Sequence, residues 1–131
     1  MIVVDASIVL ELMLQTPAAA TIEQRLFGAR GETLHAPHLI DIEVLQVLRR
    51  YATRGAISEH RGRLAVALLS RFPMSRYGHE PFLPRIWALR ANLTAFDAAY
   101  VALAEGLACP LLTRDQHLAS APVARGVVEL L

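Results

Sequence analysis

Short apolar runs alternate with longer amphipathic stretches along this chain, and that alternation constrains its fold more than any other feature. Residues 2–5, IVVD, form a short run rich in β-branched residues, which is typical of a buried strand. The run leads directly into a helix through Ala6 and Ser7. Strands that alternate with helices predict an α/β fold with a mostly parallel central sheet of four to five strands and helices on both faces. The 131 residues suffice for one domain, residues 1–131, with a core of its own.

Turn and cap signals place the other elements. Thr16 followed by Pro17 predicts the start of a helix that runs to about Arg30 and ends at Gly31. The remaining predicted elements are, in chain order, a strand at 33–36, an amphipathic helix from Pro37 to Gly55, a helix from its cap Ser58 to about Ser70, a weak extended segment at 74–77, a helix from about Pro81 to Arg90, a helix capped by Thr94, a strand at 111–113 and a last strand at 127–130. The helices between 37 and 70 are expected to form a hairpin.

Four carboxylates stand where such a fold can bring them to one place. Asp5 and Asp115 follow predicted strands, and ligands of open α/β sheets bind outside the carboxyl ends of the strands. Glu43 and Asp97 lie in helices that can reach the same crevice. Two unit charges about 4 Å apart repel by roughly 4 kcal/mol at an effective dielectric of about 20, so such a cluster needs a cation or protons. Oxygen ligands favour hard cations, and we expect Mg²⁺, with Mn²⁺ as an alternative.

Three of these acids also have a structural interpretation. Asp5 and Asp115 can each cap the helix or turn that follows. For either residue taken alone, this capping role is as plausible as a metal-binding one. Asp97 stands three residues after Thr94, a spacing close to that of a capping box, and its charge suits the helix dipole.

Glu43 is harder to explain as a surface residue. Its helical neighbours include Leu39, Ile40 and Val47, and a carboxylate on a mostly apolar strip is costly unless it is paired or bound to metal. The same holds for Asp41, which is flanked by apolar residues too. Spacing alone therefore does not choose between Glu43 and Asp41.

The middle of the chain is basic although the net charge is only +1. All 13 basic residues are arginine, and nine of them lie between residues 49 and 90 beside only two acids, a net charge of +7 for that stretch. Arginine binds phosphate through two parallel hydrogen bonds and stacks on bases, so this stretch suits a nucleic-acid substrate. Arg49 and Arg50 are the candidate RNA-binding residues. The alternative is a solvated helical face.

The sequence resembles the PIN-domain ribonucleases of the VapC toxin type almost from end to end. The resemblance is carried by the opening IVVDASIVLELM, the segment IDIEVLQVLRR, the stretch LTAFDAAYVALAEGLACPLLTRD and the closing VVEL. It implies a single PIN-like domain. It also favours Glu43 over Asp41, because the family's acidic metal-site positions fall on Asp5, Glu43, Asp97 and Asp115, and its supporting hydroxyl residues fall on Ser7 and Thr113.

The resemblance further implies a metal-dependent endoribonuclease that acts as the toxin of a type II toxin–antitoxin pair and inhibits translation. In such chemistry metal ions activate water, orient the scissile phosphate and stabilise developing charge, so hydrolysis leaves a 5′-phosphate and a 3′-hydroxyl. An antitoxin whose C-terminal segment lies across the active-site groove is the expected protein partner. The alternatives are a PIN nuclease of RNA maturation and a non-catalytic interaction module.

Composition adds three expectations. Cys109 is the only cysteine, which excludes an intramolecular disulfide and fits a cytoplasmic protein, and no window approaches a membrane span. An apolar content of 54% predicts a partner surface, with a homodimer as the default and a heterotetramer or larger complex with the antitoxin. No two histidines have metal-ligand spacing, so most are expected at the surface or in loops: His35, His38, His60, His79 and His117.

Overall fold

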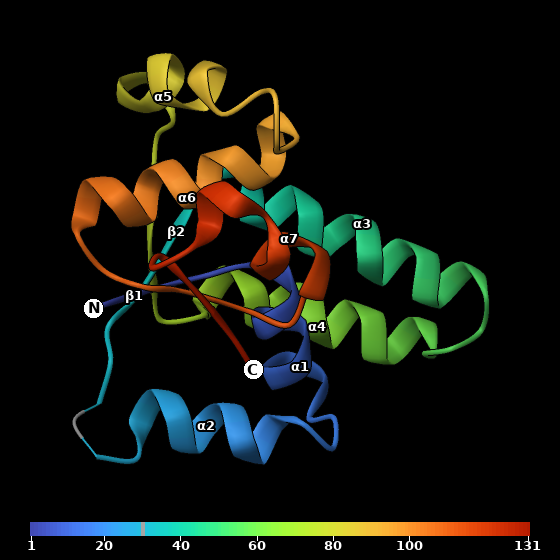
Figure 1. Ribbon diagram of the computed structural model, residues 1–131. Helices are drawn as coiled ribbons and strands as arrows, with labels where there is room; N and C mark the ends of the chain where they lie inside the picture. Colours follow the sequence, from blue (N-terminus) through green and yellow to red (C-terminus); the bar gives the residue numbers. More distant parts are fainter. Residues whose placement is uncertain (30) are drawn as a thin grey trace.

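Five parallel strands form one central sheet in the computed structural model, which describes residues 1–29 and 31–131 (Figure 1). The strands are β1 (Ile2–Val4), β2 (Leu34–Pro37), β3 (Met74–Tyr77), β4 (Leu111–Thr113) and β5 (Val128–Leu130). Their order is β3-β2-β1-β4-β5, and every pairing is parallel. The chain builds the sheet outward from β1 on one side, then crosses to the other side with β4. The topological switch point, where ligands bind in such sheets, therefore lies between β1 and β4.

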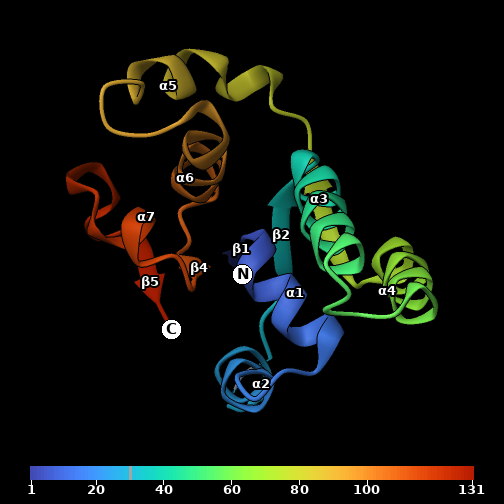
Figure 2. The same cartoon turned by 90° about the vertical axis from the view of Figure 1, so that its right-hand side faces the viewer.

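Helices cover both faces of the sheet, as the sequence predicts. The helices are α1 (Ala6–Leu14), α2 (Ala19–Phe27), α3 (Leu39–Thr53), α4 (Glu59–Arg71), α5 (Leu83–Ala88), α6 (Ala95–Leu107) and α7 (Gln116–Ser120), with 3₁₀ turns η1 (Glu80–Phe82) and η2 (Pro122–Ala124). Both views show α6 above the sheet and α1 and α2 below it, with the α3–α4 hairpin to one side (Figures 1 and 2). None of the helices in the described ranges is both long and apolar enough to cross a bilayer.

The core lies where β1 and β4 are enclosed by α1 and α6. Every residue of β1 and β4 is inaccessible to solvent. The side chains on both faces of these strands must therefore be apolar or hydrogen-bonded. In α6 the run Ala98–Ala104 is buried on all sides, which explains why alanine alternates there with larger residues. Small side chains let this helix approach the sheet closely, and the start of α6 is thereby fixed above the switch point.

The α3–α4 hairpin follows its predicted signals closely. Gly55 adopts φ of 72°, a left-handed conformation that ends α3 and that side chains with a Cβ rarely adopt. The Ser58 side chain accepts a hydrogen bond of 3.1 Å from the main-chain N–H of Arg61 and so caps α4. Pro37, by contrast, is the last residue of β2, and α3 begins two residues later.

Two predicted helices have wrong boundaries. The cap signal of Thr16 fails because its hydroxyl donates to the Glu11 carboxylate instead, and α2 begins at Ala19. The helix also ends earlier than predicted, at Phe27 with Gly28 as its C-cap, while Arg30 itself lies outside the described residues. The helix expected from Pro81 to Arg90 is split into η1 and α5, because Pro84 has no N–H to continue an α-helix from the preceding turn. The segment at 74–77, predicted as weakly extended, is a full edge strand paired with β2.

Candidate active site

Asp5 occupies the carboxyl end of β1 and is the most buried of the four acids, with 7% of its surface exposed. Its side chain caps α1 by accepting from the main-chain N–H groups of Ser7 at 3.0 Å and Ile8 at 3.3 Å. The Ser7 hydroxyl donates to the same oxygen, Oδ1, at 2.5 Å. The capping interpretation of Asp5 is therefore correct, and it fixes the carboxylate in one orientation.

The end of β4 supports Asp5 from the other strand. Thr113, which is fully buried, donates its hydroxyl to Asp5 Oδ2 and accepts from the main-chain N–H of Asp115 at 2.9 Å. The Ser7 hydroxyl in turn accepts from the main-chain N–H of Arg114 at 3.0 Å. Ser7 and Thr113 thus tie the ends of β1 and β4 together around a single carboxylate.

Asp115 and Asp97 each lie at the start of a helix, α7 and α6 respectively. Asp115 is exposed and caps α7, accepting from the N–H groups of His117 at 2.8 Å and Leu118 at 3.4 Å. Asp97 lies in the first turn of α6, where its main-chain N–H donates to the Thr94 hydroxyl at 3.2 Å. The N-cap at Thr94 is as predicted, and it leaves the half-buried Asp97 carboxylate at the start of the helix.

Glu43 reaches the site from α3 and is held there by a residue that the sequence interpretation missed. The Tyr100 hydroxyl donates to Glu43 Oε2 at 3.1 Å, and only 1% of Tyr100 is exposed. A buried tyrosine hydroxyl usually has a polar partner. Tyr100 follows Asp97 by three residues on the same face of α6. A tyrosine in this alanine-rich run was therefore a readable signal for a buried acceptor nearby.

Burial and mutual repulsion connect the four acids electrostatically. Burial raises the pKa of Glu43, and the charges of Asp97 and Asp5 raise it further against the hydrogen bond from Tyr100. Burial also raises the pKa of Asp97, and the nearby Asp115 adds to this rise. The pKa of Asp5 is raised by burial, although its hydrogen bonds oppose the rise. Glu43 therefore lies within electrostatic reach of Asp5 and Asp97, and Asp97 within reach of Asp115.

The donor set fits a hard cation that retains water. Within residues 1–29 and 31–131, no three histidine, cysteine, aspartate or glutamate side chains lie close enough together to ligate one ion directly. Mg²⁺ is usually held by one or two carboxylates and keeps several water molecules, so it does not require a closed protein cage. Partly buried carboxylates within electrostatic reach of one another match that requirement.

The whole chain also matches known proteins in sequence. Residues 2–124 match the PIN domain family. Over 131 residues, covering all of this chain and 99% of the relative, the sequence is 45% identical to ribonuclease VapC12 of Mycobacterium tuberculosis. The chain belongs to the VapC ribonucleases of the PIN-domain family.

Solved structures extend the comparison to the fold. Mycobacterium tuberculosis VapC20, described as a toxin that cleaves the sarcin–ricin loop, superimposes with a TM-score of 0.71 at 16% identity, covering 99% of this chain and 98% of that one. VapBC2 from Rickettsia felis, bound to a DNA fragment from its promoter, gives a TM-score of 0.70 at 11% identity, covering 100% and 99%. At such low identity these two likenesses establish the PIN fold alone.

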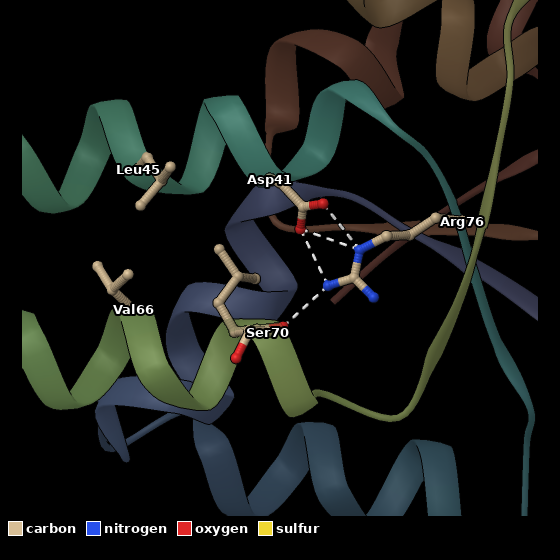
Figure 3. A pocket seen from close by; sticks show the side chains of 6 residues that line it. Asp41, Leu45, Val66, Ser70 and Arg76 are labelled. Atoms are coloured by element: carbon tan, nitrogen blue, oxygen red, sulfur yellow. Dashed lines mark hydrogen bonds and ion pairs between the residues drawn. The ribbon is translucent and has the colours of Figure 1, made fainter.

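The structure separates Glu43 from Asp41, which the spacing of the sequence could not do. Asp41 lies on another side of α3 and faces α4 and β3 (Figure 3). Arg76 of β3 donates to both Asp41 oxygens, at 2.8 Å from Nε and 2.9 Å from Nη2, and Nη2 also donates to the main-chain carbonyl of Leu69 at 2.9 Å. Asp41 is thus neutralised by a structural ion pair and is directed away from the other acids.

The arginines of the middle stretch also differ in role. Several of them bind other parts of the protein: Arg61 donates to the Leu14 carbonyl at 2.5 Å, Arg76 pairs with Asp41, and Arg85 pairs with Glu105 at 2.7 Å. Arg49 and Arg50 are exposed, but only Arg50 lines the surface beside Glu43. At 3.6 residues per turn Arg50 stands about 20° from Glu43 around α3, whereas Arg49 stands about 120° away.

The histidines follow their prediction with one exception. His35 is buried in β2, where its ring nitrogens lie 2.8 Å from the Tyr77 hydroxyl and 2.9 Å from the Thr33 hydroxyl. Both ring nitrogens therefore have hydrogen-bond partners, which explains why a buried strand tolerates this histidine. The other four are exposed. Among these His117 lies near enough to the site to lower the pKa of Asp97.

Proposed function

We propose that this protein is a metal-dependent endoribonuclease, the toxin of a toxin–antitoxin pair, which hydrolyses RNA and so inhibits translation. One observation supports the proposal: beside the switch point of the sheet, Glu43 feels the charges of Asp97 and Asp5, and Asp97 feels that of Asp115, in a chain 45% identical to a ribonuclease over its full length. A silent interaction module would have no need for partly buried carboxylates that raise one another's pKa values.

The cofactor that suits this donor set is Mg²⁺, with Mn²⁺ as the alternative. Asp5, Glu43 and Asp97 would hold it directly or through water, and Asp115 would complete or orient the set. When bound, such an ion activates water, orients the scissile phosphate and neutralises the charge that develops on its oxygens.

The chain's own residues prepare the site for this chemistry. Ser7 and Thr113 hold both oxygens of Asp5, and Tyr100 fixes one oxygen of Glu43, so the carboxylates are oriented before substrate arrives. Such supporting hydrogen bonds orient ligands and tune their basicity. In-line hydrolysis at this edge would leave a 5′-phosphate and a 3′-hydroxyl, and it requires neither a covalent nucleophile nor a catalytic histidine.

The protein partners follow from exposed apolar surface. Large apolar side chains stand in solvent on α4 and α5, among them Leu64, Val66, Leu68 and Trp87. Patches of this kind mark interfaces. We assign them to a homodimer and to an antitoxin that binds it in a heterotetramer or larger complex, as VapB accompanies VapC in the Rickettsia felis assembly. An RNA substrate and the free thiol of Cys109 suit the cytoplasm.

The test is cleavage of RNA by the purified protein. Total RNA incubated with the protein and Mg²⁺ should be cut at discrete sites, and sequencing of the ends should find 5′-phosphates. Chelation of the metal should abolish cleavage. Intact RNA under all metal conditions, with the protein correctly folded, would contradict the proposal.

Expression in cells separates a toxin from a nuclease of RNA maturation. The protein alone should arrest growth, and co-expression of an antitoxin encoded beside it should relieve the arrest and yield a stable complex. Harmless expression of an enzyme that cleaves RNA in vitro would favour the maturation nuclease.

A further inference from the structure

An apolar groove adjoins the acidic site and shares one wall with it. It has a volume of about 420 Å³, and Glu43 lines it together with Ile42, Gln46, Arg50 and Phe96. Phe96 is 64% exposed and Ile42 is 68% exposed, although both side chains are large and apolar. The known features of the site do not account for these two residues.

The groove is fixed to the acids by the chain itself. Ile42 directly precedes Glu43 on α3, and Phe96 directly precedes Asp97 in the first turn of α6. Gln46 and Arg50 follow Glu43 along one stripe of α3, at three and seven residues. A molecule held at Glu43 and Asp97 would therefore lie beside Phe96. Along α3 it would next reach the amide of Gln46 and then the guanidinium of Arg50.

The chemistry of these groups matches a nucleotide. An aromatic ring in solvent offers a flat apolar face on which an unpaired base can stack, and every base has such a face. The Gln46 amide can donate to a base edge, and its oxygen, which accepts from Arg49 Nε at 3.2 Å, has a second lone pair for a base donor. The Arg50 guanidinium has no side-chain partner in the described part of the structure and suits a backbone phosphate.

We propose that this groove is a subsite for an unpaired nucleobase of the RNA, stacked on Phe96 next to the scissile phosphate. The inference rests on the proposed ribonuclease function. A phosphate at the four acids places a neighbouring base within reach of the groove. Unstacked bases of loops and single strands are the usual targets of sequence-specific RNA recognition. The subsite thus selects single-stranded RNA, and Gln46 contributes to the choice of base.

The test is the dependence of binding on the base itself. Asp5→Asn keeps the α1 cap and removes an acid of the cleavage site, so binding can be measured on uncut RNA. In this background we compare a short oligoadenylate with an abasic oligomer of the same length, and then add Phe96→Ala or Phe96→Leu. Stacking predicts that the oligoadenylate binds about 5- to 150-fold more tightly than the abasic oligomer, and that both Phe96 variants remove most of this ratio.

Phe27→Ala is the matched control, because Phe27 is also exposed, at 49%, but lies at the end of α2. It should leave the ratio unchanged. A ratio that survives in both Phe96 variants, which circular dichroism must show to be folded, would overturn the subsite. Loss of antitoxin binding by Phe96→Ala with an unchanged ratio would assign the groove to the protein partner instead. RNA cleavage by the wild type is scored separately, so the ribonuclease function can stand while the subsite fails.

Discussion

Asp41 and Glu43 are two residues apart on one helix, yet their surroundings differ completely. Arg76 donates hydrogen bonds to both oxygens of Asp41, so the positive guanidinium neutralises the carboxylate at hydrogen-bond distance. Glu43 instead receives one hydrogen bond from a neutral hydroxyl, and burial raises its pKa, with a further rise from the negative charges of Asp97 and Asp5. The charge of Asp41 is therefore compensated by a positive partner within the protein, whereas the charge of Glu43 is not.

The contrast shows how a structural carboxylate differs from one that awaits a ligand. A protein of marginal stability does not keep like charges together without a compensating use. Ser7, Thr113 and Tyr100 orient the acids without neutralising them, since a hydroxyl brings no charge. That arrangement preserves the attraction for a cation, whereas an arginine in the same place would remove it.

The largest expected effect is on catalysis. Asp97→Asn keeps the helix start, because the cap is made by Thr94, but it removes a charge from the acidic set. Activity should fall by about 10²-fold or more, measured as the rate of RNA cleavage, with Asp5→Asn and Glu43→Gln as companions. Asp41→Asn is the matched control and should retain the activity of the wild type per folded molecule. Full activity in a folded Asp97→Asn protein would return Asp97 to a purely structural role.

The next largest effect is on stability and concerns Asp41 and its partner Arg76. Arg76→Leu leaves the Asp41 carboxylate without its partner and the Leu69 carbonyl with only the main-chain N–H of Phe72 as a donor. The free energy of unfolding, measured with urea, should fall by about 1–3 kcal/mol because a partly buried charge loses its hydrogen bonds. Adding Asp41→Asn should recover part of this loss, and cleavage by the folded fraction should stay unchanged. A variant that loses activity while keeping its stability would place the Asp41–Arg76 pair in the active site.

Much of the fold could be predicted because its signals are local. The β-branched runs and the glycine after α3 determine their elements almost independently of the rest of the molecule. Thr16 shows the limit of such signals, because the Glu11 carboxylate takes its hydroxyl and no pattern within α2 announces that competition. Pro84 was a readable signal for a split helix that the periodicity of the segment concealed.

The site could be located in part for the same reason. Acids that follow strands of a parallel sheet must meet at one edge, so Asp5 and Asp115 were predictable from order alone. Periodicity could not say which face of α3 meets α6 and which meets β3, because that depends on packing between distant segments. Arg76 lies 35 residues from Asp41 in the sequence, and Tyr100 lies 57 from Glu43.

A smaller effect should appear in the pH dependence of stability without metal. The folded-state pKa of Glu43 is raised above its ordinary 4.5, so the folded protein loses stability as pH rises through that raised value. In chelator, Glu43→Gln should therefore melt higher than the wild type at neutral pH, and the difference should disappear below about pH 4.5. Asp41→Asn should not show this pattern. A Glu43→Gln protein that is less stable at neutral pH would indicate that the carboxylate stabilises the fold.

The smallest effect is on the salt dependence of RNA binding, and it should differ between the neighbouring residues Arg49 and Arg50. Arg50→Ala should lower the slope of log affinity for single-stranded RNA against log salt by about 0.7, the value for one lost phosphate contact. Arg49→Ala should change the slope less, because Arg49 points to another side of α3 and donates to Gln46 at 3.2 Å. Equal losses would mean that both contact RNA, and unaltered slopes would leave both as a solvated face.

The most direct measurement of the central claim is the melting temperature with and without Mn²⁺ in the wild type, Glu43→Gln and Asp41→Asn. Metal at 100 times its dissociation constant adds about 2.7 kcal/mol to a folded state that binds it. We predict a clear upward shift for the wild type and an equal shift for Asp41→Asn from its own baseline. Glu43→Gln should shift little at the same metal concentration. A shift in Glu43→Gln as large as in the wild type, or no shift in any of the three proteins, would contradict a metal site built on Glu43.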